Sequence, residues 1–180
     1  MKKLTAGLSV FVSAIVVVLA LSAPAAAHLM VAGHGTLNIV NNNVFMVLSL
    51  PLSAFEGIDD NADGEIDLTE FNRHQAAVIK TVKQHVSLRD KSRALLLEDV
   101  LLSAEKAHDH NGHHHNQISE VIVMGRFTLG AVHPPLSFHV GIYGEGETGQ
   151  VLNITASHKA ENLRYKFQLT PEQPTRRLFP

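Results

Sequence analysis

Short runs of alternating apolar and polar residues recur along the chain and predict β-strands. Residues 34–40 alternate in this way, the asparagines at 41–43 favour a turn, and residues 44–50 resume the alternation. This arrangement predicts a β-hairpin. Further strands are expected at 120–129, 136–143, 151–157 and 163–169, the third of them after a glycine-rich turn at 144–149.

A spacing of three to four residues replaces the alternation after residue 67. The apolar face at this spacing is made of Leu68, Phe71, Gln75, Val78, Val82 and His85 or Val86. We therefore expect an amphipathic helix that runs to about residue 85. The next stretch has two interpretations. Residues 86–90 and 93–103 fit a second hairpin around a polar turn, but residues 94–102 fit a helix nearly as well.

Six to eight short strands with regularly spaced turns are typical of an antiparallel β-sandwich, in which one face of each strand is buried. We predict a mainly β, immunoglobulin-like sandwich over residues 28–170, with a helical insert at about 51–86. An open sheet with the helix across one face is the alternative. Residues 171–180 contain three prolines, and we expect this tail to be draped over the surface or disordered.

The first 27 residues have the three parts of a bacterial-type signal peptide. Lys2 and Lys3 form a basic start, residues 8–21 an apolar run, and residues 25–27 a run of alanines suited to cleavage. We expect a periplasmic or secreted product that begins at His28 and has no membrane span once the signal is removed. Because the chain has no cysteine, we expect core packing and a bound ion to provide the stability that disulfides would otherwise give. Asp and Glu outnumber Lys and Arg by 17 to 15, which does not favour a nucleic-acid partner.

Residues 59–70 read DDNADGEIDLTE and match the calcium-loop pattern at every position. The candidate ligands are Asp59, Asn61, Asp63, Glu65 through its backbone carbonyl, Asp67 directly or through a water, and Glu70 with both carboxylate oxygens. These hard oxygens suit Ca²⁺. Gly64 supplies the positive φ that the sharp turn needs. A surface turn rich in Asp, Asn and Gly, with no ion, is the alternative.

This loop resembles the EF-hand family. The resemblance covers the loop and the following helix closely but the preceding helix poorly, because residues 51–58 allow two helical turns at most and Gly57 weakens the second. In the family, loops usually pair through short β contacts, and Ile66 at the eighth position is the apolar residue placed for such a contact. The sequence contains no second loop. We therefore expect weak calcium binding, on the order of 10⁻⁴ to 10⁻³ M.

Histidine is abundant, with twelve in the chain, and five lie close together at His108, His110, His113, His114 and His115. In an extended backbone alternate residues point the same way, so pairs of these imidazoles can bind Zn²⁺, Ni²⁺ or Cu²⁺. A solvated loop without an ion is the alternative. At a new amino terminus, His28 could chelate copper, similar to the amino-terminal histidine of secreted copper proteins built on β-sandwiches. His133, His139 and His158 are interpreted as satisfied surface histidines.

Three functions are compatible with these features. The first is an exported calcium-binding protein, not an enzyme, in which Ca²⁺ orders the inserted loop. The second is a periplasmic transition-metal buffer or delivery protein that uses the histidine tract. The third is a calcium-shaped interaction or adhesion module with an unidentified protein partner. The sequence has no thiol nucleophile, no GxSxG, no HExxH and no phosphate-binding glycine loop.

Overall fold

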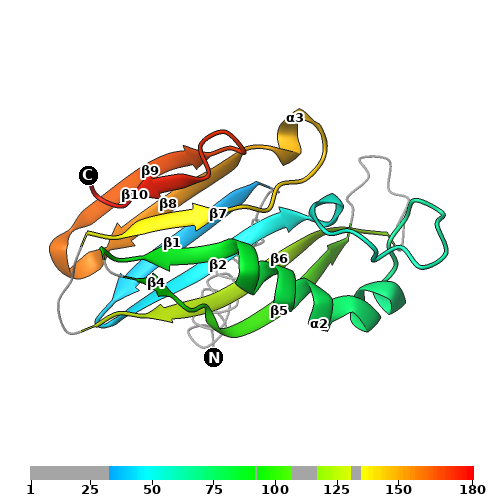
Figure 1. Ribbon diagram of the computed structural model, residues 1–180, viewed down its shortest axis with the longest axis horizontal. Coiled ribbons are helices and arrows are strands. Elements are labelled where there is room, and N and C mark those ends of the chain that lie inside the picture. The colour runs from blue at the N-terminus through cyan, green and yellow to red at the C-terminus, as the bar shows by residue number, and fades with distance from the viewer. Residues whose placement is uncertain (1–32, 92, 107–116, 131–134) are drawn as a thin grey trace, which may run out of the picture.

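The computed structural model describes residues 33–91, 93–106, 117–130 and 135–180. Within them the chain forms two β-sheets and one long helix, so a mainly β fold with a helical insert is confirmed (Figure 1). The predictions for the signal peptide, for His28, for His133 and for the five-histidine tract lie outside the described residues.

The larger sheet has six strands in the order β5-β6-β2-β1-β8-β9. These strands are β1 (His34–Val40), β2 (Asn43–Pro51), β5 (Glu98–Lys106), β6 (Ile118–Thr128), β8 (Leu152–His158) and β9 (Leu163–Leu169). β1 and β2 form the predicted hairpin, in which His34 faces Ser49 and Val40 faces Asn43. β1 also pairs with β8, and this pair is parallel, whereas the other neighbours in this sheet are antiparallel.

The smaller sheet has four strands in the order β10-β7-β3-β4. These strands are β3 (Val86–Arg89), β4 (Ala94–Leu95), β7 (Ser137–Val140) and β10 (Thr175–Arg177). β3 and β4 pair in an antiparallel hairpin, and β5 follows as a strand of the other sheet. The hairpin interpretation is therefore confirmed only for residues 94–95, because residues 98–106 pair with β6, and the helical interpretation of residues 94–102 is wrong.

The carboxyl-terminal segment is ordered and belongs to the fold. β10 pairs with β7, joining Thr175 to His139 and Arg177 to Ser137. Leu178 is buried in the core, and its N–H donates to the carbonyl oxygen of Leu136 at 2.8 Å. The prediction of disorder is thus wrong for this tail, because one buried leucine and a short strand fix it in spite of its prolines.

The predicted helix is α2 (Leu68–His85), which has the expected bounds. Asp67 caps its amino terminus by accepting hydrogen bonds from the N–H groups of Thr69 and Glu70. Phe71, Val78 and Val82 are buried, as their spacing predicts. The remaining helical segments are single turns: η1 (Leu52–Ala54), α3 (Gly146–Gly149) and η2 (Lys159–Glu161). The expected preceding helix is thus reduced to η1.

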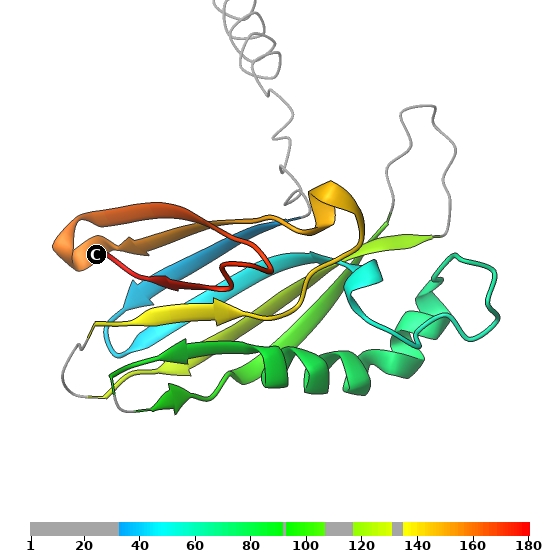
Figure 2. The same ribbon diagram turned by 45° about the horizontal axis from the view of Figure 1, so that its top comes forward.

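One hydrophobic core lies between the six-stranded sheet on one side and the four-stranded sheet with α2 on the other (Figures 1 and 2). β1 and β2 contribute Leu37 and Leu48, and the smaller sheet contributes Leu88 and Phe138, all fully buried. Because α2 runs directly into β3, the helical insert and the smaller sheet form one continuous covering layer. Among the described helices, none is both long and apolar enough to cross a membrane.

Candidate calcium site

The calcium-type loop lies at one end of the molecule, between η1 and α2 (Figure 2). On its amino-terminal side Phe55 and Ile58 are buried and anchor the chain to the core. On its carboxyl-terminal side Glu70 and Phe71 are buried in the first turn of α2. The residues between these two anchors are mostly exposed, which leaves their oxygen atoms accessible to an ion from solvent.

The first half of the loop is shaped by hydrogen bonds from its own backbone. Asp59 accepts from the N–H of Ala62 at 2.7 Å and from the N–H of Gly64 at 2.9 Å, one bond to each carboxylate oxygen. These bonds draw the Asp59 side chain across the turn. Gly64 has a φ of +82°, the left-handed conformation that the sequence predicts for it.

The two alternate positions after Asp59 repeat this arrangement. Asn61 Oδ1 accepts from the N–H of Asp63 at 2.8 Å, and Asp63 Oδ1 accepts from the N–H of Glu65 at 2.8 Å. The two side chains also meet, since Asn61 Nδ2 donates to Asp63 Oδ2 at 2.9 Å. Side chains that bond backbone groups two residues ahead stabilise a tight turn, so Asn61 and Asp63, like Asp59, also determine the shape of the loop.

Glu70 joins the two ends of the loop. Its Oε1 accepts from the N–H of Asp60 at 3.1 Å, and its Oε2 accepts from the N–H of Asp67 at 3.0 Å. The side chain is buried, with Glu70 only 5 % exposed. In the part of the chain that the structure describes, no Lys, Arg or His forms an ion pair with Glu70. A buried carboxylate of this kind favours a nearby cation.

The loop is also attached to the larger sheet. The carbonyl oxygen of Ile66 accepts a hydrogen bond from the N–H of Ile118, the first residue of β6, at 2.7 Å. The Ile66 side chain packs against the core at the same place. Ile66 is therefore tied to β6 by one backbone hydrogen bond, and no β-bridge forms at Ile66 within the described residues.

Asp60 is held by α2 and not by the loop. Its carboxylate pairs with the guanidinium of Arg73, and its Oδ1 lies 2.8 Å from Nε2 of His74. The hydrogen bond from His74, together with that from Arg73, lowers the pKa of Asp60 below its ordinary value. Arg73 thus neutralises Asp60, a loop carboxylate that the motif does not count as a ligand.

The structure places all six predicted ligands on one turn, but it does not gather their side chains around a single point. Among the described residues, no group of three or more His, Cys, Asp or Glu side chains is placed to hold a metal ion. Asp67 in particular caps α2 with Oδ1. The donors suit Ca²⁺ by type, and calcium coordination at about 2.3–2.6 Å requires their side chains to turn inward.

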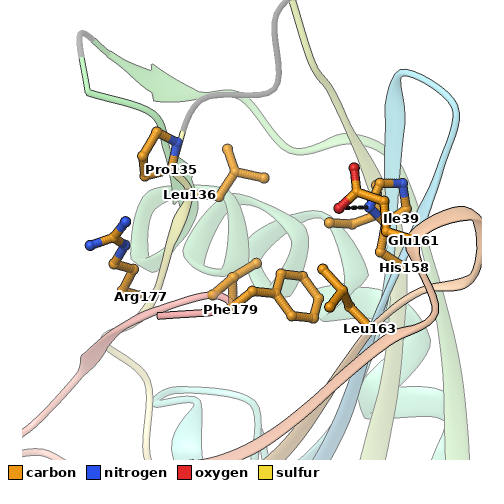
Figure 3. A pocket seen from close by; sticks show the side chains of 9 residues that line it. Ile39, Pro135, Leu136, His158, Glu161, Leu163, Arg177 and Phe179 are labelled. Carbon is orange, nitrogen blue, oxygen red and sulfur yellow. Dashed lines mark ion pairs between the residues drawn. The ribbon is translucent and has the colours of Figure 1, made fainter.

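A separate pocket of about 300 Å³ lies near the carboxyl terminus (Figure 3). Its apolar wall includes Leu136 and Phe179, and its polar wall includes Arg177 and a pair formed by His158 Nδ1 and Glu161 Oε2, which are 3.2 Å apart. His158 is buried, so its interpretation as a surface histidine is wrong, although it has a polar partner as expected.

Two features of the site were not identified from the sequence. The pairing of Asp60 with Arg73 and His74 could have been predicted from the sequence, because these two consecutive side chains lie one helical turn after the end of the loop. The bond between Ile66 and Ile118 could not, because it depends on the route of the chain through three intervening strands.

Comparison with models of known protein families gives no match, and comparison with curated proteins gives none either.

Proposed function

We propose that this chain is an exported calcium-binding protein, not an enzyme, in which Ca²⁺ orders the loop at residues 59–70. The motif supplies the ligand set, and the loop geometry supports it. Gly64 adopts the required left-handed conformation, and alternate side chains fold over the turn. Export to the periplasm or the medium is proposed on the sequence of residues 1–27 alone.

The observation that carries the proposal is the position of Glu70. This buried carboxylate connects both ends of the loop, and Asp59, Asp63 and Asp67 add further negative charge nearby. Within the described chain, none of these four carboxylates has an ion pair to a basic residue. A divalent cation coordinated by oxygen would offset this charge, and Glu70 is placed to contribute both of its oxygens.

The experiment is a calorimetric titration with Ca²⁺ of the mature protein and two matched variants. Glu70→Gln removes one carboxylate oxygen and the charge from a side-chain ligand. Glu65→Gln makes the same change in the same loop at a residue expected to bind through its backbone carbonyl, so its affinity should stay close to that of the parent. Equal affinity of Glu70→Gln and the parent would refute the proposed site.

For the fold we propose the immunoglobulin-like type of β-sandwich with the EF-hand-like insert. Two sheets that share one core, with the insert between β2 and β3, support this proposal. The parallel β1–β8 pair is a departure from a purely antiparallel sandwich. An experimentally determined structure in which the two sheets do not pack face to face would refute it.

Two alternative functions remain as proposals with their own tests. A transition-metal buffer would carry Zn²⁺, Ni²⁺ or Cu²⁺ when purified untagged, and replacing the five histidines between residues 108 and 115 by serine would remove most of that metal. An interaction module would bind a protein partner only when calcium is present. Elemental analysis of the purified protein discriminates between the calcium and transition-metal functions.

A further inference from the structure

Two histidines from different elements meet beside the smaller sheet. His85 is the last residue of α2, and His139 lies in β7, which pairs with β3 immediately after the helix. The N–H of Gly141 donates to the carbonyl oxygen of His85 at 2.8 Å, which fixes the chain between the two rings. His85 is exposed and His139 is half-buried, so an ion from solvent can reach both.

Residue 141 is a glycine, so no side chain fills the space beside these two imidazoles. A Cβ at Gly141 would lie 3.3 Å from Nε2 of His139 and 3.5 Å from Nδ1 of His85. One point in space is therefore close to a nitrogen of each ring. His139 is also oriented by its other nitrogen, since Nδ1 forms a 2.9 Å hydrogen bond with Oγ1 of Thr175 in β10. Metal-binding histidines are commonly oriented through their second nitrogen in this way.

We propose that His85 Nδ1 and His139 Nε2 form a two-histidine site for a divalent transition metal such as Zn²⁺, with the ion in the gap beside Gly141. Imidazole nitrogen suits Zn²⁺, Ni²⁺ and Cu²⁺ and does not suit Ca²⁺. This site is independent of the proposed calcium loop, because it uses no residue of that loop.

The surroundings of the site limit its affinity. Zinc–nitrogen bonds are about 2.0–2.1 Å long, so both rings must approach the ion by roughly 1 Å. His85 is at the exposed end of a helix and can make this movement. Burial, followed by the nearby positive charge of Arg89, lowers the pKa of His139, which favours the neutral imidazole that a metal ion requires. The charge of Arg89 also repels an incoming cation, which keeps the affinity moderate. Because the site has two protein ligands, water completes the coordination of the ion.

The test is a Zn²⁺ titration of the mature protein followed by NMR of the histidine ring nitrogens, which resolves each histidine separately from the others. We expect the signals of His85 and His139 to shift together and to saturate at the same zinc concentration. In His85→Gln, the zinc concentration needed to shift the His139 signal should rise about a hundredfold. The reason is that in the parent the second contact to a bound ion is intramolecular.

A second variant retains both histidines and fills the gap. Gly141→Ala places a methyl group between the two nitrogens, and this glycine has no positive φ that alanine would strain. We expect it to abolish the joint shift. Gly130→Ala is the matched control, since a Cβ there has no neighbour within 4 Å, and it should leave the shift unchanged. Independent shifts of the two histidines, or full binding by Gly141→Ala, would overturn the proposal.

Discussion

Replacing Gly64 by alanine tests whether the calcium loop depends on its left-handed turn. Gly64 has a φ of +82°, and a Cβ at this position would meet no atom within 4 Å. The substitution therefore adds no steric clash with neighbouring residues, and its cost comes from the backbone conformation alone. That cost is about 1–2 kcal/mol for a residue with a side chain.

The surroundings of Gly64 determine whether this cost lowers the calcium affinity or the stability of the calcium-free protein. Residues 60–65 are exposed and make few apolar contacts, so without calcium the loop can relieve the strain by opening locally. Calcium must then close it again. We expect Gly64→Ala to weaken calcium binding roughly 5- to 30-fold, the factor that corresponds to about 1–2 kcal/mol, with little change in the melting temperature of the calcium-free protein.

Gly57 provides the matched control. It has a φ of +70° and an equally open Cβ position, but it lies before the loop and between two buried residues, Phe55 and Ile58. Its strain cannot be relieved locally, so Gly57→Ala should lower the melting temperature by about 2–4 °C per kcal/mol and leave calcium affinity near that of the parent. Calorimetry and thermal unfolding measure both effects. Unchanged affinity of Gly64→Ala would refute this reasoning.

Three further predictions concern packing, pH and calcium removal. Gly35→Ala would bring a Cβ to 2.5 Å from Leu48 Cδ2 and 2.7 Å from Ile154 Cδ1, so urea unfolding should show a loss of about 1–3 kcal/mol; stability equal to the parent would contradict this packing. Because the folded protein lowers the pKa of Asp60, this carboxylate adds stability that is complete above its ordinary value of 3.8 and is lost as the pH falls through the lower folded value. Melting temperatures of Asp60→Asn should therefore lie below those of the parent at pH 7 and converge with them in acid, and a constant difference would exclude this linkage. Chelation of calcium should preserve the β-sheet circular dichroism, because both sheets share a core outside the loop, and complete unfolding would show that the core depends on the ion.

The sequence predicts those parts of the fold that depend on local pattern. Alternation is sufficient for the β1–β2 hairpin, and the buried positions of α2 follow from the spacing of Phe71, Val78 and Val82. The same spacing predicts that Leu68 is buried, but this residue is 49 % exposed because it occupies the first turn of α2, beside the open loop.

Local pattern is insufficient where apolar residues are not buried as their type suggests. Residues 94–102 are rich in leucine, so their periodicity fits a helix as well as a strand. Leu96, between β4 and β5, and Leu101, in β5, are nevertheless exposed. For the calcium-type loop, the pattern identifies the residues that share one turn. It cannot indicate that Ile118 supports the loop or that His85 approaches His139, because both contacts depend on how distant strands pair.

The parallel pairing of β1 with β8 determines when the larger sheet can be completed. β1 lies between β2, its immediate neighbour in the chain, and β8, which begins only at Leu152. During synthesis, β1 therefore keeps an unpaired edge until residues 152–158 are available, more than a hundred residues later. Long-range pairing of this kind slows folding and prolongs the unfolded state. Under the export proposed above, such a delay would keep the chain unfolded while it crosses the membrane, whereas in a dense cytoplasm the same exposed edge would be a site for aggregation.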